Sequence, residues 1–118
     1  MKKVLLLLAL TFPLSGCLKT NLVPPAPLVN QVNDFDGQTY RSLIILQGAL
    51  NSLGSSIKAD PANLNSLKPA FNQASGDYNL AQAAWRIYHS TQSNQQDVTE
   101  TLNKAQADVT NLQKEVQK

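Results

Sequence analysis

The sequence has few of the residues on which disulfides, metal sites and nucleic-acid binding depend. Its 118 residues include a single Cys, so an internal disulfide and every metal site built from several Cys residues are excluded. Only 15% of the residues are charged, and the formal net charge is +2. Lys2 and Lys3 lie at the amino terminus, and the chain after them has eight basic and eight acidic residues. Nucleic-acid binding therefore lacks its usual excess of positive charge.

Reactive side chains are also sparse. His89 is the only His, near the carboxyl end of a predicted helix, where a solvated His or a His of the C-terminal turn is expected; a general base or metal ligand is the alternative. Glu100 and Glu115 lie outside their apolar stripe and form no Glu-x-x-His motif. Helix capping explains Asp34 and Asp36. The sequence also lacks a Gly-rich phosphate loop and an EF-hand pattern. We expect no enzyme, no metal and no cofactor.

The amino-terminal sixteen residues have the layout of a secretory signal. Lys2 and Lys3 form a positive start, and an apolar run covers residues 4–10. A helix needs roughly 20 apolar residues to span a bilayer, so this run is too short to do so. We interpret residues 1–16 as a cleavable targeting segment. It is followed directly by Cys17, within the sequence Leu14-Ser15-Gly16-Cys17.

This four-residue motif resembles the lipobox of bacterial lipoproteins. The resemblance covers the first 17 residues and implies cleavage between Gly16 and Cys17, a diacylglycerol on the Cys17 thiol and often an acyl chain on the new amino group. Two or three acyl chains meet the requirement for stable membrane anchoring. In enterobacterial lipoproteins an Asp after the Cys is the usual inner-membrane retention signal. Leu18 therefore implies the outer membrane, where the organism has one. The alternative is an ordinary secretory leader with an unrelated Cys.

Proline is concentrated directly after the predicted lipidation site. Residues 17–33 form a predicted linker that holds Pro24, Pro25 and Pro27. Proline fixes φ and removes a hydrogen-bond donor, so this sequence predicts an extended, semi-rigid polyproline II segment. We expect a stalk that holds the domain off the lipid headgroups. A ligand for a proline-binding groove is the alternative.

Residues 34–118 carry three apolar stripes at helical spacing. Each stripe repeats at intervals of three and four residues, which keeps its members on one helix face. The spacing predicts helices at about 38–58, 67–91 and 94–117, and hence an all-α, antiparallel three-helix (up-down-up) bundle with coiled-coil-like packing. The stripes are Leu43, Leu46, Leu50, Leu53 and Ile57; Phe71, Ala74, Tyr78, Ala81, Trp85 and Tyr88; and Val98, Leu102, Ala105, Val109, Leu112 and Val116.

Local signals mark the expected helix ends. A polar residue at position 36 or 39 can cap the first helix, and Pro61 can open a short turn ahead of the second. Ser93 and Gln96 have the spacing of a capping box for the third helix. Gly76 lies within the second stripe without a change of phase, so one helix, kinked at most, is expected there.

These features favour a non-enzymatic structural or interaction module of the cell envelope. It would be anchored in a membrane by lipid and would present the bundle to a partner envelope protein. A cell-wall linker is one alternative, because a lipidated Cys, heptads and a terminal Lys118 resemble the murein lipoprotein, in which a terminal Lys is joined to peptidoglycan. That family's Tyr-Arg before the Lys is absent. The oligomeric state stays open.

A ligand-binding lipoprotein is the second alternative. Aromatic rings stack on sugars, and Trp85 and Tyr88 lie near the end of the second helix, together with Arg86. Because the aromatic spacing coincides with the core stripe, we expect most of these rings to fill the core. Tyr88 and Arg86 are the residues we expect to be most exposed.

Overall fold

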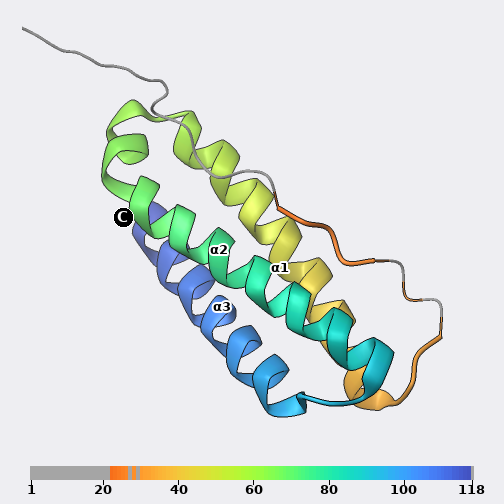
Figure 1. Ribbon diagram of the computed structural model, residues 1–118. Helices are drawn as coiled ribbons and strands as arrows, with labels where there is room; N and C mark the ends of the chain where they lie inside the picture. Colours follow the sequence, from red (N-terminus) through yellow and green to blue (C-terminus); the bar gives the residue numbers. More distant parts are fainter. Residues whose placement is uncertain (1–21, 27, 29, 118) are drawn as a thin grey trace, which may run out of the picture.

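The chain folds into three long helices that pack against one another (Figure 1). The computed structural model describes residues 22–26, 28 and 30–117. Helix α1 covers Asp34–Lys58, α2 covers Pro61–Thr91 and α3 covers Gln95–Val116, and each runs antiparallel to the one before it. The described part of the chain contains no strand. The predicted all-α three-helix bundle is confirmed.

The three apolar stripes meet in one core. Helix α2 contributes the largest side chains, because Trp85, Tyr78 and Phe71 are all at most 1% exposed. Helix α1 places Leu43, Leu50 and Ile57 against them, and all three are completely buried. Burying each such side chain contributes about 1.5–3 kcal/mol. Two stripe members on α3, Leu102 and Val116, are half-buried at the edge of the core.

Helix α1 begins four residues earlier than the predicted position 38. Asn33 is its N-cap, with an extended backbone and a side-chain oxygen that accepts a hydrogen bond from the backbone N–H of Asp36 at 2.9 Å. The caps expected at positions 36 and 39 are therefore wrong. Asp36 and Thr39 lie inside the helix instead, and both side chains are buried.

Helix α2 begins at Pro61 rather than near residue 67 and continues without a break past Pro69 and Gly76. Asp60 caps it, because its carboxylate accepts a hydrogen bond from the backbone N–H of Ala62 at 3.1 Å. The short turn predicted before the second helix is thus its first part. Its apolar side chains, Leu64 and Leu67, pack against the core, which compensates for the backbone hydrogen bond that Pro69 cannot donate.

Helix α3 starts without the predicted capping box. Its N-cap is Asn94, which has a left-handed backbone (φ 62°) and makes no side-chain capping bond. The Ser93 hydroxyl instead pairs with that of Thr91 at 2.7 Å, and the Gln96 amide donates to Glu100 at 2.9 Å. Neither side chain makes the reciprocal bonds of a capping box.

The proline-containing segment before α1 lies against the bundle. The described residues of 22–33, here called the docked segment, form no helix or strand. The backbone N–H of Val23 donates to Asn79 Oδ1 at 3.0 Å, and the Tyr78 hydroxyl donates to the Val23 carbonyl at 2.9 Å. Burial raises the pKa of Tyr78 to about 12, against a smaller opposing effect of Arg86, so this hydroxyl keeps its proton at neutral pH.

A free stalk is therefore wrong for this part of the predicted linker. Pro25 is buried, and four apolar side chains of the docked segment pack against the core: Leu22, Ala26, Leu28 and Val32. Burying that apolar surface stabilises contact with the bundle over a solvated polyproline helix. Within the described ranges, none of the three helices combines the length and apolar character that a membrane span requires.

We predict opposite outcomes for one substitution at two glycines of α1. Gly48→Ala should raise the free energy of unfolding by about 0.5–1 kcal/mol, because Ala favours a helix interior and no atom lies within 4 Å of the new Cβ. Gly54→Ala should gain less or lose stability, because its Cβ would lie 3.2 Å from Cζ of the buried Phe71 ring. Urea denaturation measures both. Equal gains would contradict this close approach of α1 and α2.

Candidate functional site

A buried carboxylate organises the end of the bundle where α1 begins and α2 ends. Asp36 is completely buried. Its Oδ1 accepts a hydrogen bond from Trp85 Nε1 at 2.8 Å, and its Oδ2 lies 2.8 Å from His89 Nδ1. The backbone N–H of Val32 also donates to Oδ2, at 3.1 Å. The carboxylate thus joins the docked segment, α1 and α2, and each of its oxygens has a donor from the fold.

His89 lies in the last turn of α2, as the sequence predicts, and its side chain is held by this carboxylate rather than solvated. The contact between Nδ1 and Asp36 Oδ2 fixes the orientation of the imidazole ring. The imidazole also packs on the Trp85 ring, with centroids 5.3 Å apart, and its side chain is 26% exposed. An Asp–His pair orients the base of a catalytic triad, which further requires a nucleophile at the second ring nitrogen. Among the described residues, no hydroxyl hydrogen-bonds to His89.

A second layer of contacts closes over the carboxylate. Asn33 Nδ2 donates to the Tyr88 hydroxyl at 2.7 Å. The Phe35 ring meets the Tyr88 ring edge-on, with centroids 4.9 Å apart, and Tyr40 packs on Trp85 at 5.4 Å. Aromatic pairs of this kind add to the stabilisation from burial alone. The start of α1 therefore covers the aromatic end of α2.

The three residues expected to bind a glycan or small ligand differ in how far they are exposed. Trp85 is 1% exposed and Tyr88 is 3% exposed, whereas Arg86 lies on the surface. The expected exposure of Tyr88 is wrong, because Asn33 and Phe35 cover it. Neither ring offers the open face that stacking on a sugar requires.

Asp36 is the central residue of this site, whereas its position in the sequence predicts only a helix cap. A signal for its burial was present. Asp36, Leu43, Leu50 and Ile57 are spaced seven residues apart, so the carboxylate falls on the same face of α1 as three core residues. A carboxylate on a core face requires hydrogen-bond donors. That spacing indicates burial but does not identify the donors.

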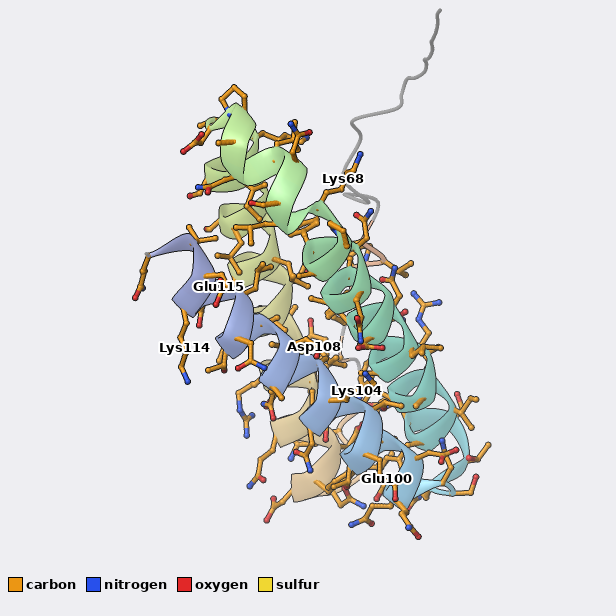
Figure 2. All side chains as sticks on the ribbon, turned by 90° about the vertical axis from the view of Figure 1, so that its left-hand side faces the viewer. Lys68, Glu100, Lys104, Asp108, Lys114 and Glu115 are labelled. Carbon is orange, nitrogen blue, oxygen red and sulfur yellow. The ribbon has the colours of Figure 1, made fainter. Side chains whose placement is uncertain are left out.

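A second polar cluster lies between α2 and α3. Lys104 donates to Asp77 Oδ2 at 3.1 Å, and Figure 2 shows Lys104 and Asp108 on the side of α3 next to α2. Burial raises the pKa of Asp108 to about 6, with a further increase from the hydrogen bond and negative charge of Asp77, while Lys104 lowers it. Asp108 Oδ2 is buried without another partner among the described residues.

Other predicted sites lie outside the described residues. These are the cleavage site at Gly16, the lipidation site at Cys17 and the peptidoglycan attachment at Lys118, and they stay predictions. Within the described ranges, no group of three or more His, Cys, Asp or Glu side chains is arranged to hold a metal ion.

Comparisons with family models, curated proteins and solved structures gave no match to this chain. A functional assignment therefore depends on the residues themselves.

Replacing Asp36 should destabilise the fold far more than replacing its neighbour Asp34. Asp36→Ala leaves the buried N–H groups of Trp85 and Val32 without an acceptor, and should lower the free energy of unfolding by about 3 kcal/mol. Asp34→Ala, in the same turn but exposed, should lower it by about 0.5 kcal/mol through the helix dipole. Urea denaturation followed by Trp85 fluorescence tests this. Similar losses for both would show that the Asp36 contacts are not formed.

The raised pKa of Asp108 predicts a pH-dependent gain from Asp108→Asn. The unfolded chain releases this proton near the ordinary pKa of 3.8, whereas the folded chain keeps it to about 6. The group therefore lowers stability as pH rises from about 4 through 6. Asp108→Asn should raise the melting temperature relative to wild type more at pH 7.5 than at pH 4.5. The control Asp97→Asn, at an exposed position on the first turn of α3, should show no such gain. If Asp108→Asn also shows no larger gain at pH 7.5 than at pH 4.5, the pKa of Asp108 is not raised in the folded chain.

Proposed function

We propose that the protein is a lipid-anchored lipoprotein of the bacterial cell envelope that presents its helical bundle to a partner envelope protein. The sequence Leu14-Ser15-Gly16-Cys17, after a charged and apolar leader, carries this proposal. Cys17 would hold a diacylglycerol on its thiol and an acyl chain on its amino group. Because Leu18 follows Cys17, the expected location is the outer membrane, facing the periplasm, where the organism has one.

The arrangement of the polar side chains supports a structural role for the bundle. Both oxygens of the Asp36 carboxylate are occupied by donors from the fold, Trp85 among them. The aromatic end of α2 is covered by the start of α1. Groups that are engaged in this way hold helices together, and they leave the outer surface of the bundle as the part that meets a partner.

Replacement of the predicted lipidation site tests the anchor. Cells that express the full chain are fed an alkyne analogue of palmitate, and labelling of the protein is read on a gel. Wild type and Thr20→Ala, a control outside the motif, should be labelled. Cys17→Ala should lose the label completely, because no other thiol is present to receive the diacylglycerol. Mass spectrometry of the amino-terminal peptide should show Cys17 as the first residue, carrying lipid. An unlabelled wild type would reject the anchor.

Cross-linking in cells tests the partner. A photo-reactive amino acid is placed at Leu80 on α2 or at Glu100 on α3, both of which are exposed. At least one position should yield a single defined adduct with an envelope protein. A matched probe at the buried Ala81 serves as the control and should yield none. If neither exposed position gives an adduct, the anchored protein does not act by presenting these surfaces to a partner.

A further inference from the structure

The segment that leads to Cys17 joins the bundle on its flank, near the middle of α2. Val23 is held there by Tyr78 and Asn79. Five peptide links separate Cys17 from Leu22, and they reach at most about 18 Å when fully extended. A stalk that stayed free up to Asn33 would have sixteen links and would reach about 55 Å. The anchor is therefore short compared with α1, which is about 37 Å long at 25 residues.

Contacts between α1 and α2 show which part of α1 lies at the level of this attachment. Tyr40 packs on Trp85, and Gly54 lies next to Phe71. Because the two helices are antiparallel, the level of Tyr78 lies midway between those two contacts, close to Gln47 of α1. The middle of α1 is thus as close to the anchor as the middle of α2.

The exposed side of α1 at this level is apolar. Tyr40, Arg41, Ile44 and Ile45, here called the α1 patch, line one open hollow on the surface. Ile45 is 71% exposed and Ile44 is 43% exposed. Arg41 supplies one positive charge at the edge of these side chains, and the exposed acid Asp34 lies about two helical turns away.

The exposed surface of α3 is polar. The exposed large apolar side chains of the described residues lie on the docked segment, α1 and α2, and none of them lies on α3: Val23, Ile44, Ile45, Leu80 and Ile87. Helix α3 exposes charged side chains of both signs, among them Glu100, Lys104 and Lys114 (Figure 2). Among the described residues, large exposed apolar side chains are therefore found on α1, α2 and the docked segment but not on α3.

We propose that the α1 patch rests on the surface of the lipid bilayer in which Cys17 is anchored. Ile44 and Ile45 would enter the headgroup region, where their burial removes apolar surface from water. Arg41 would meet lipid phosphates, and the Tyr40 ring would lie at the interface. This inference rests on the proposed lipidation.

Distance and size favour lipid over another protein as the occupant of this patch. The anchor holds the flank of the bundle within about 18 Å of the bilayer, so contact with lipid requires no second binding partner. A specific protein interface of standard size draws on about 20–30 residues from each partner, whereas the α1 patch has four. The positive charge of Arg41 also complements an anionic headgroup.

A fluorescent label at position 45 tests this contact. The only natural Cys is lipidated in the proposed mature protein, so Ile45→Cys provides a single thiol for an environment-sensitive dye. Ala107→Cys, exposed on α3, is the matched control. Each acylated protein is reconstituted into vesicles of phosphatidylethanolamine and phosphatidylglycerol that contain nitroxide-labelled lipid. We expect the dye at position 45 to be quenched at least about twofold more than the dye at 107, because only position 45 would enter the interface.

Three outcomes separate the possible failures. Equal quenching at both positions, with mass spectrometry showing lipid on Cys17, would overturn the bilayer contact and leave the anchor intact. A dye at position 45 that is shielded from water but not quenched by the nitroxide lipid would show that protein covers the patch, and would also overturn it. Absence of lipid on Cys17 in the purified wild-type protein would reject the proposed function and this inference together.

The charge of Arg41 provides a second readout. Replacing phosphatidylglycerol by phosphatidylcholine in the vesicles should weaken quenching at position 45, because the anionic headgroups are lost. In Ile45→Cys combined with Arg41→Gln, this dependence on lipid charge should disappear. The matched control, Lys114→Gln on α3, should retain it. If Arg41→Gln leaves the dependence unchanged, Arg41 does not contact the lipid phosphates.

Discussion

The buried carboxylate of Asp36 determines how the docked segment, α1 and α2 fit together at one end of the bundle. A carboxylate taken out of water destabilises the fold unless hydrogen-bond donors surround it, and here the donors come from Val32, Trp85 and His89. Trp85 and His89 are four residues apart and therefore share a face of α2. The start of α1, the last turns of α2 and the path of the chain before α1 are consequently fixed by one group.

The hydrogen bond from Val32 to Asp36 also affects what the prolines of the docked segment do. One end of the docked segment is held by Val32 at Asp36, and the other by Val23 at the middle of α2. The chain between them has to run along the bundle. Proline restricts the unfolded chain and so reduces the conformational entropy that docking removes. The same residues that suggested a stiff, free stalk thus favour a segment that stays bound.

The sequence contained enough information for the three helices and their core, and too little for the polar site. Stripes such as Leu43, Leu50 and Ile57 predict a buried face because helical spacing is a local property. The Asp36–Trp85 hydrogen bond joins residues 49 positions apart, and the contact from Tyr78 to Val23 spans 55. The spacing of residues within one helix does not specify which residues far apart in the sequence form a hydrogen bond. Helix starts were misplaced for a related reason, since the burial of Leu64 and Leu67 is a tertiary effect.

The docked segment and the proposed anchor together limit which surfaces a partner protein can reach. A tether that reaches at most about 18 Å from the flank of the bundle leaves little room for a folded domain between that flank and the bilayer. If the α1 patch faces lipid, α3 faces the aqueous compartment. Its exposed groups, among them Asp97, Glu100 and Lys114, carry charges of both signs. Recognition there would depend on hydrogen bonds and complementary charge, which set orientation and specificity more than affinity. A weak, oriented contact of that kind suits partners that lipid anchors already confine to one membrane.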